Sequence, residues 1–338
     1  MSQQTTANGT PVAVLGAGSW GTALALLLAQ GGSAVRLWDR TAGLVESIRA
    51  EGENRRYLPG TRLPASIAPT TDMEAAVAGA ACVVVAVPST AVGGVLAHFR
   101  PYLSDTCDIV LASKGLAPDS GMLPFEVAEA ELGHANAIVA LSGPNLAGEI
   151  ARGVPAAAIA ACPDPDAARR TALLFSRPTF RVYTGTDRTG VEIGGAVKNV
   201  LAIAGGVSDG LGFGDNAKAA LLTRGLAEMT RFGVACGARQ ETFYGLAGVG
   251  DLMATAASRL SRNWRVGEGI AQGETLEAIL ARLGQVAEGV PTARAVVHLS
   301  KARGVDMPVC RAVAGLLFDG WAPMEAVTTL LSRAQRDE

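Results

Sequence analysis

From Val12 to Tyr183 the chain alternates short apolar runs with longer stretches of helical periodicity. The short runs are rich in valine, isoleucine and alanine. The first of them, Val12–Leu15, shows no alternation of apolar with polar positions, which is typical of a parallel strand covered on both faces. Because strand and helix patterns follow each other throughout, we predict a doubly wound, mostly parallel sheet with helices on both faces. The predicted strands are Val12–Leu15, Ala34–Trp38, Cys82–Val87, Asp108–Ala112, Ala137–Leu141, Ala156–Ala160 and Phe180–Tyr183. The predicted helices are Thr22–Gln30, Thr41–Glu51, Asp72–Ala80, Thr90–Arg100, Pro124–Leu132 and Asp166–Phe175.

A glycine-rich turn joins the first predicted strand to the first predicted helix. Gly16, Gly18 and Gly21 have the spacing G-x-G-x-x-G. In a dinucleotide-binding unit the first glycine permits the tight turn, the second lets backbone approach a pyrophosphate, and the third lets helix pack on strand. The free amides at the helix start would then hold the anion. The turn therefore predicts a Rossmann-type domain that binds NAD or NADP, with a ligand-free turn as the alternative.

Two opposed charges follow the second predicted strand, where a dinucleotide site meets the adenosine ribose. Asp39 favours NAD, because a carboxylate bonds the ribose hydroxyls. Arg40 favours NADP, because a guanidinium can hold the extra phosphate. The sequence leaves the choice between NAD and NADP open.

After about Gly190 the β-branched runs give way to helical patterns. We therefore predict an α/β domain followed by an all-α domain. The predicted divisions are a polar tail over 1–10, a dinucleotide-binding Rossmann-type domain over 11–189 and a helical substrate and catalytic domain over 190–338. The predicted helices there are Val191–Ser208, Asn216–Phe232, Glu241–Ala256, Thr275–Gly284, Pro291–Arg303, Arg311–Asp319 and Pro323–Gln335.

The composition of the 338 residues limits the classes of partner. Apolar residues make up 49% and charged residues 18%, with a net charge of −2, so we expect a well-packed globular protein. Nothing in that balance favours nucleic acid or an anionic membrane as the main partner. The longest apolar stretch, Val191–Val207, contains Glu192, Lys198 and Asn199, which are costly in lipid, so we predict no membrane span.

The cysteines and histidines give no metal pattern. The five cysteines are scattered and lack C-x-x-C spacing, which favours reduced thiols and a cytoplasmic location. The three histidines are isolated, so we predict no metal site. The sequence has no nucleophile elbow, because its G-x-S-x-G match, G-V-S-D-G (206–210), lies at the end of a predicted helix and does not follow a strand. The nucleoside-triphosphatase motif G-x-x-x-x-G-K-[ST] does not occur in the sequence.

Two predicted strands end in small polar turns. Ser113-Lys114-Gly115 follows one strand, and Ser142-Gly143-Pro144-Asn145 follows the next along the chain. Because ligands of doubly wound sheets lie at the carboxyl ends of the strands, we expect these turns to face the cofactor.

Lys198 is the candidate general acid/base. It lies in an apolar, glycine-rich helix just past the predicted boundary. Removal from water lowers the proton affinity of an ammonium group, which would suit acid/base chemistry near neutral pH. The alternative is a lysine that extends from the helix edge into solvent.

Two further polar groups interrupt the helical half. Asp251, in G-L-A-G-V-G-D-L, could hold Lys198 or a substrate hydroxyl, or it could cap the following helix. Ser261, Arg262 and Asn263 combine a hydroxyl, a guanidinium and an amide in what we expect to be one short turn. That set suits a phosphate, with a solvated surface arginine as the alternative.

Several motifs together resemble the bacterial NAD(P)-dependent sn-glycerol-3-phosphate dehydrogenase family over nearly the whole chain. Their joint order and spacing are specific, although any one alone would be weak. The motifs are G-A-G-S-W-G-T-A-L-A (16–25), Y-L-P-G (57–60), S-K-G (113–115), S-G-P (142–144), K-N-V (198–200), G-L-A-G-V-G-D-L (245–252), S-R-N (261–263) and V-A-E-G-V-P-T (286–292).

The resemblance implies roles for individual residues. It makes Lys198 the proton acceptor and gives Lys114 contacts with both cofactor and substrate. The other implied substrate contacts are Gly143, Asn145, Asp251, Ser261, Arg262 and Asn263. The other implied cofactor contacts are Ser19, Trp20, Arg40, Tyr57, Ala147, Arg262, Val286 and Glu288. The family usually has serine or threonine and then phenylalanine where this chain has Asn145-Leu146.

The implied reaction is reversible hydride transfer between the nicotinamide and dihydroxyacetone phosphate, giving sn-glycerol 3-phosphate for phospholipid synthesis, with Asp251 orienting Lys198. Another two-domain dehydrogenase, of the 3-hydroxyacid or ketopantoate type, and a non-catalytic dinucleotide-binding regulator are the alternatives. The sequence leaves a homodimer possible.

Overall fold

The computed structural model describes residue 9, residues 11–117 and residues 120–332. Apart from Gly9, the predicted tail lies outside the described residues. The chain forms two compact units. The first runs to Ser113 and resumes over Pro124–Arg188, and the second joins Lys114–Leu123 to the chain from Thr189 onward. The predicted domain division stays a prediction, but the segment that begins at Lys114 packs with the helical unit although it lies between strand and helix of the other.

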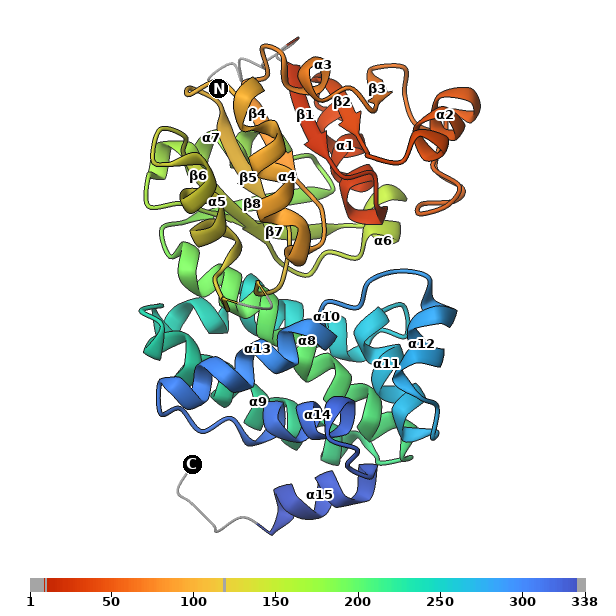
Figure 1. The fold of residues 1–338 in the computed structure, drawn as a ribbon, viewed down its shortest axis with the longest axis vertical. Helices are drawn as coiled ribbons and strands as arrows, with labels where there is room; N and C mark the ends of the chain where they lie inside the picture. Colours follow the sequence, from red (N-terminus) through yellow and green to blue (C-terminus); the bar gives the residue numbers. More distant parts are fainter. Residues whose placement is uncertain (1–8, 10, 118–119, 333–338) are drawn as a thin grey trace. The chain divides into compact units, whose positions relative to one another are not determined.

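The first unit is built on one eight-stranded sheet in the order β3-β2-β1-β4-β5-β6-β7-β8 (Figure 1). All neighbouring strands are parallel except β6 and β7. The predicted doubly wound, mostly parallel sheet is therefore confirmed. The strands are β1 (Pro11–Leu15), β2 (Ala34–Trp38), β3 (Ile67–Thr70), β4 (Cys82–Val85), β5 (Asp108–Leu111), β6 (Ile138–Ser142), β7 (Ala156–Ala161) and β8 (Phe180–Gly185).

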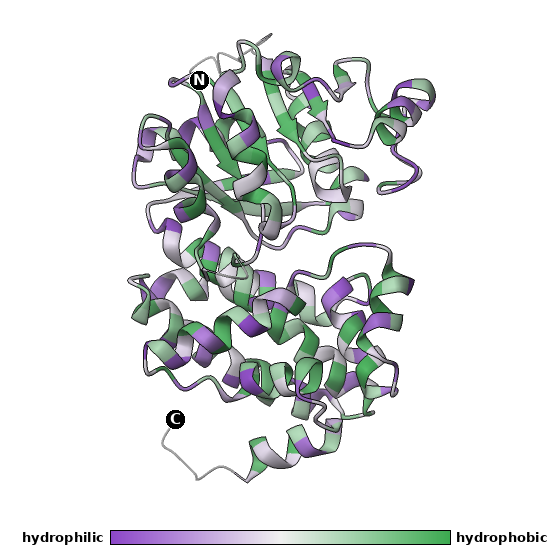
Figure 2. Ribbon diagram, viewed as in Figure 1, coloured by the Kyte–Doolittle hydropathy of each residue, from purple (hydrophilic) through white to green (hydrophobic). Residues whose placement is uncertain are grey.

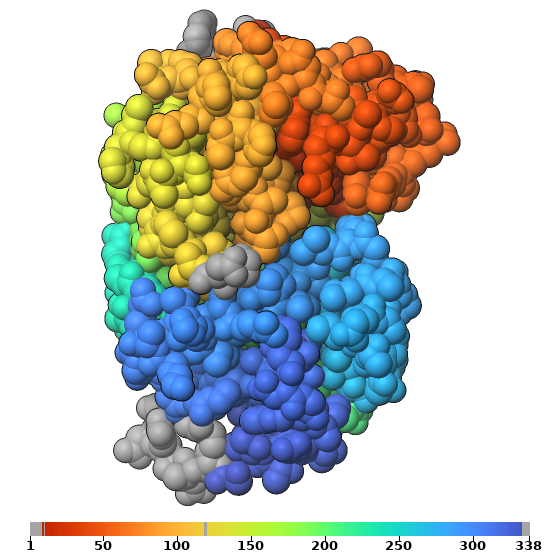
Figure 3. All heavy atoms as spheres, viewed as in Figure 1, coloured from red at the N-terminus to blue at the C-terminus, as the bar shows by residue number. Residues whose placement is uncertain are grey.

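Helices cover both faces of this sheet, and the central strands carry strongly hydrophobic residues (Figure 2). Along β1, Val12 and Val14 pack in a core with α1 and α7, while Ala13 and Leu15 pack in a second core with α4 and α5. In the space-filling view α4 and α5 cover the second face (Figure 3). The helices are α1 (Ser19–Gln30), α2 (Ala42–Glu51), α3 (Met73–Val77), α4 (Val92–Phe99), α5 (Pro124–Leu132), α6 (Ala147–Ala151) and α7 (Pro165–Phe175).

Apart from the segment that begins at Lys114 and the turns between elements, the described residues of the second unit form helices. Its longest helix is α8, which is buried along most of its length. By length and composition α8 could span a membrane, but its most apolar window is entirely buried inside the protein. The helices are α8 (Arg188–Gly210), α9 (Asp215–Ala235), α10 (Asp251–Ala257), α11 (Arg262–Ala271), α12 (Leu276–Leu283), α13 (Gly289–Ala302), α14 (Pro308–Phe318) and α15 (Pro323–Leu331). The predicted last helix extends to Gln335, and its end lies outside the described residues.

Three elements were not predicted. Strand β3 reads I-A-P-T, and its Pro69 is tolerated because β3 is the edge strand. Helix α6 is a single short turn after β6. Helix α11 begins at Arg262, where we expected a short turn, so that expectation was wrong.

The predicted helix over Glu241–Ala256 is broken into three parts. A tight turn over Gln240–Tyr244 and a wider one over Leu246–Gly250 precede α10. The break falls at Gly248, whose backbone is not helical (φ −96°, ψ −105°). A Cβ at Gly248 would lie 2.0 Å from the carbonyl oxygen of Phe243, so only glycine permits this close approach. As a result α10 begins at Asp251.

Candidate active site

The glycine-rich turn of the first unit has the geometry that its spacing predicts. Gly16 has φ +108°, a left-handed conformation that favours glycine. A Cβ at Gly21 would lie 1.9 Å from the carbonyl oxygen of Gly16, so Gly21 lets α1 pack on the turn. A Cβ at Gly18 would meet no atom within 4 Å, and Gly18 is the N-cap of α1. The turn thus offers open space directly before a helix N-terminus, as a pyrophosphate requires.

The loop Asn54–Gly60 is fastened to this turn. Asn54 is fully buried, and its Nδ2 donates to the carbonyl oxygen of Ala17 (2.7 Å) and to the hydroxyl of Thr22 (2.8 Å). The Ser19 hydroxyl donates to the carbonyl oxygen of Tyr57 (2.6 Å). The structure therefore brings together Ser19 and Tyr57, two residues that the resemblance assigns to the cofactor.

Asp39 is bound to the same turn. Its Oδ2 accepts from the backbone N–H of Ala17 (3.0 Å), and its Oδ1 accepts from that of Thr41 (2.9 Å). The Arg40 side chain is exposed beside it. Each Asp39 oxygen keeps a further lone pair, so these contacts are compatible with either NAD or NADP.

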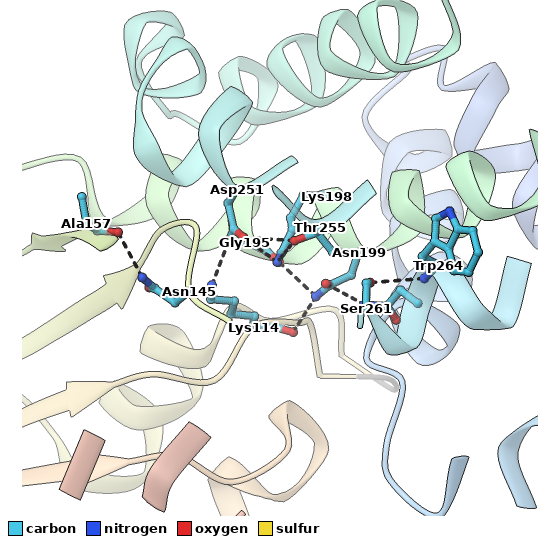
Figure 4. Close-up of polar contacts among 11 residues, drawn as sticks. Lys114, Asn145, Ala157, Gly195, Lys198, Asn199, Asp251, Thr255, Ser261 and Trp264 are labelled. Carbon is cyan, nitrogen blue, oxygen red and sulfur yellow. Dashed lines mark hydrogen bonds and ion pairs between the residues drawn. The ribbon is translucent and has the colours of Figure 1, made fainter. Parts of the chain in front are cut away.

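The turn after β6 is held by its neighbour β7. Gly143 has φ +138°, and a Cβ there would lie 2.9 Å from the carbonyl oxygen of Ala157. Asn145 Nδ2 donates to that same oxygen (3.0 Å, Figure 4). The buried Oδ1 of Asn145 has no hydrogen-bond partner among the described residues.

In the second unit two lysines converge on one buried carboxylate (Figure 4). Lys198 Nζ lies 2.7 Å from Asp251 Oδ1, and Lys114 Nζ lies 2.7 Å from Asp251 Oδ2. Lys198 also donates to the hydroxyl of Thr255 (2.7 Å). The relative exposure of Lys198 is 6% and that of Asp251 is 1%. A solvated lysine at the helix edge is therefore excluded, and Asp251 holds Lys198 instead of capping α10, whose N-cap is Gly250.

The electrostatics of this cluster favour proton transfer. Burial lowers the pKa of Lys198 to about 8, because the ammonium form loses hydration, and the nearby charge of Lys114 acts in the same direction. Burial alone would raise the pKa of Asp251, but the two ammonium groups hold it below its ordinary value. Asp251 therefore stays ionised while Lys198 can exchange a proton near neutral pH.

Thr255 was not predicted as a site residue. It lies one helical turn after Asp251 on α10, and its hydroxyl donates to Asp251 Oδ1 (3.2 Å) while accepting from Lys198. The i, i+4 spacing of aspartate and threonine was the sequence signal that could have identified it.

The predicted phosphate group of residues lies at the start of α11. Ser261 is its N-cap, and the Ser261 Oγ accepts from the backbone N–H of Trp264 (3.2 Å). Arg262 is exposed. Asn263 is buried, its Nδ2 donates to Asn199 Oδ1 (2.8 Å), and its Oδ1 accepts from the N–H of Gly289 (2.9 Å). Of the three side chains, Arg262 is thus the one most open to an anion.

The other residues predicted to contact the cofactor lie near the starts of α1, α6 and α13. Val286 is 44% exposed, and Glu288 is the N-cap of α13, near enough to Arg262 for its charge to act on the guanidinium. Trp20 is the second residue of α1, and Ala147 is the first residue of α6. Among the described residues no three His, Cys, Asp or Glu side chains gather as a metal site would require.

Comparison with known proteins identifies the family. Residues 11–168 match the N-terminal model, and residues 187–328 the C-terminal model, of NAD-dependent glycerol-3-phosphate dehydrogenase. The chain belongs to this family. The predicted enzyme class, an oxidoreductase that uses NAD or NADP, is thereby confirmed.

Members of the glycerol-3-phosphate dehydrogenase family resemble the chain along nearly its whole length. The chain is 51% identical to the glycerol-3-phosphate dehydrogenase [NAD(P)+] of Thermus thermophilus over 97% of its own length and 99% of the relative. It is 48% identical to that of Geobacillus kaustophilus, with 97% and 96% covered. The crystal structure of glycerol-3-phosphate dehydrogenase from Coxiella burnetii superposes with a TM-score of 0.93 at 40% identity, covering 96% of this chain and 99% of that one.

Proposed function

We propose that this protein reversibly transfers hydride between NAD(P)H and C2 of dihydroxyacetone phosphate, giving sn-glycerol 3-phosphate, with Lys198 as general acid/base. The observation that carries the proposal is the buried Lys198 ammonium, held by Asp251 and Thr255 with a pKa near 8. The glycine turn and the family membership support the dinucleotide as the hydride carrier.

The proton has a defined path in this proposal. During reduction Lys198 Nζ donates a proton to the substrate carbonyl oxygen as it becomes an alkoxide, and during oxidation the neutral amine accepts the proton from the C2 hydroxyl. Asp251 orients Lys198, and Lys114 brings a second positive charge to the same carboxylate. We assign the substrate phosphate to Arg262, an exposed residue whose guanidinium can form forked, charge-assisted bonds. Gly143, Asn145, Ser261 and Asn263 complete the proposed substrate contacts.

The proposed cofactor contacts rest on the geometry of the glycine turn and on the resemblance to the family. We assign the pyrophosphate to the Gly16–Gly21 turn and the start of α1, where Gly18 leaves open space. The first unit supplies the proposed contacts Ser19, Trp20, Arg40, Tyr57 and Ala147. The second unit supplies the proposed contacts Lys114, Arg262, Val286 and Glu288. We further propose a cytoplasmic location without a nucleic-acid partner, and a homodimer remains a possible assembly.

The deciding assay measures oxidation of NADH and of NADPH after addition of dihydroxyacetone phosphate. The proposal expects rapid oxidation with this substrate and little with 2-ketoacids. Oxidation with a ketoacid alone would favour a 3-hydroxyacid or ketopantoate-type enzyme, and binding of cofactor without oxidation would favour a regulator. The ratio of the two cofactor rates also decides between Asp39 and Arg40 as the dominant influence.

Replacing Gly18 and Gly21 separately tests the cofactor assignment. Gly18→Ala adds a methyl group to empty space, so its unfolding midpoint should stay unchanged while the Kd for NADPH rises at least about tenfold, since the methyl occupies the pyrophosphate position. Gly21→Ala forces the turn apart and should lower the free energy of unfolding by about 1–3 kcal/mol. Thermal unfolding and fluorescence titration measure both effects. Unchanged affinity in Gly18→Ala would place the pyrophosphate elsewhere.

The pH dependence tests the role of Lys198. Reduction needs the protonated amine, so its kcat/KM should fall as the pH rises through about 8. Oxidation needs the neutral amine, so its kcat/KM should rise through the same pH. Initial rates in both directions from pH 6 to 10 give the two profiles, and two parallel profiles would contradict a single acid/base group.

A further inference from the structure

The side chain of Asn54 uses both ends of its amide group to join two segments of the first unit. It is fully buried, although it belongs to the loop Asn54–Gly60. Its Nδ2 donates to the carbonyl oxygen of Ala17 (2.7 Å) and to the hydroxyl of Thr22 (2.8 Å). Its Oδ1 accepts from the backbone N–H of Tyr57 (3.2 Å). Asn54 therefore ties the loop to the glycine turn through a buried polar group.

Thr22 closes a triangle of contacts with Asn54 and Ala17. It lies on α1 and is also fully buried. Its hydroxyl accepts from Asn54 Nδ2 and donates to the carbonyl oxygen of Ala17 (3.4 Å). A carbonyl oxygen can only accept and the Tyr57 N–H can only donate, so the Asn54 amide has one orientation in which all these contacts are made. We call the side chains of Asn54 and Thr22, with the Ala17 carbonyl group that they bind, the turn clamp.

The turn clamp fixes the peptide group that joins Ala17 to Gly18. This peptide is trans, and a planar trans peptide carries its C=O and its N–H on opposite sides. Because the clamp binds the Ala17 carbonyl on one side, the N–H of Gly18 points to the other side. The N–H of Ala17 is held as well, by Asp39 Oδ2 (3.0 Å). The peptide therefore cannot rotate without breaking contacts of the clamp.

The backbone of Gly18 is accessible to a ligand. A Cβ at Gly18 would meet no atom within 4 Å, and Gly18 is the N-cap of α1. A backbone N–H that points into open space at a helix N-terminus is a donor suited to an anion. The side chains of Asn54 and Thr22 are fully buried, so they can act on such an anion only through the peptide that they hold.

We propose that Asn54 and Thr22 are positioning residues for the dinucleotide, which turn the Gly18 N–H toward the pyrophosphate. The proposal rests on the proposed function for the identity of the ligand. When the Ala17 carbonyl loses the amide of Asn54, the peptide can rotate and the pyrophosphate loses a charge-assisted hydrogen bond. Such a bond changes affinity by about tenfold or more.

The first test is Asn54→Ala, with NADPH as the probe in a fluorescence titration. The Kd for NADPH should rise at least about tenfold, together with the KM for NADPH. At saturating NADPH, kcat and the KM for dihydroxyacetone phosphate should stay within about twofold of wild type, because the substituted residue lies in the unit that carries the glycine turn. A folded Asn54→Ala variant with unchanged Kd would overturn the proposal.

A pair of substitutions at Thr22 decides the question even if Asn54→Ala does not fold. Thr22→Val keeps the shape of the side chain and removes the hydroxyl, so the Kd for NADPH should rise at least about fivefold. Thr22→Ser keeps the hydroxyl, so its Kd should stay within about twofold of wild type. Equal Kd values in the two variants would mean that the hydroxyl does not position the turn.

Asn136→Ala is the matched control, because Asn136 also donates to two backbone carbonyls of the first unit, those of Ser104 and Cys107. Its unfolding midpoint should fall as the midpoint of Asn54→Ala does, but its Kd for NADPH should stay within about twofold of wild type. A rise in Kd equal to that of Asn54→Ala would mean general destabilisation and would contradict a positioning role.

The titration separates this proposal from the proposed function, because NADPH binding is measured without substrate. A wild-type protein that binds NADPH but does not oxidise it with dihydroxyacetone phosphate would refute the proposed function, and the Kd ratios of the variants would still decide on the turn clamp. Wild-type turnover with unchanged Kd in the variants would refute the turn clamp alone.

Discussion

Lys198→Ala is expected to lower kcat at least about 100-fold in both directions, while the Kd for NADPH stays nearly unchanged. The substitution removes the group that donates and accepts the proton, and it leaves Asp251 with Lys114 as its remaining ammonium partner. The affected residue lies in the helical unit, whereas the glycine turn assigned to the pyrophosphate lies in the other unit, so cofactor binding should survive. Steady-state oxidation of NADPH and fluorescence titration measure the two quantities.

The matched control for this prediction is Lys218→Ala. Lys218 also pairs with an aspartate in the helical unit, Asp209, at 2.6 Å, and its side chain is more exposed than that of Lys198. Its ion pair among the described residues is with Asp209 and not with Asp251. Its kcat should stay within about twofold of wild type. Turnover close to wild type in Lys198→Ala would remove the general acid/base assignment, even if the other predictions hold.

The fold could be predicted where the chain's own pattern determines it. The runs of β1 and β4 are apolar on both faces because both faces are covered, so they stand out from the helices between them. The edge strand β3 has one neighbour and contains Pro69, so it lacks that signature. The break at Gly248 depends on the position of the Phe243 carbonyl, which periodicity does not show.

Some residues of the candidate site could likewise be predicted from the sequence, and others could not. Lys198 and Asp251 could be singled out because a charge in an apolar, glycine-rich context is unusual, and the structure brings them into contact. The start of α11 was misjudged because the serine cap at Ser261 looked like one member of a polar turn. The hydrogen bonds of Asn199 could not be predicted by such reasoning, because they join three segments that lie far apart in the sequence.

Asp251→Asn is expected to have the largest combined effect on activity and stability. The carboxylate offsets two buried or nearly buried ammonium groups, since the side chains of Lys198 and Lys114 are 7% and 14% exposed. Removing one partner of a buried ion pair costs about 3–5 kcal/mol, because the remaining charge is uncompensated. The attraction of Asp251 is also what opposes the lowering of the Lys198 pKa, so that pKa should fall below about 8 and reduction near neutral pH should lose its proton donor.

The sign of the pH dependence separates this explanation from simple loss of packing. Between the lowered lysine pKa of the folded variant and the ordinary value of about 10.4, the unfolded chain binds more protons. The free energy of unfolding of Asp251→Asn should therefore rise with pH from 7 to 9, relative to wild type, in urea titrations. Glu274→Gln is the control, because the more exposed Glu274–Arg282 pair should contribute at most about 1 kcal/mol. A loss of stability that is the same at all these pH values would mean that Asp251 stabilises the unit by packing and not by compensating the two lysines.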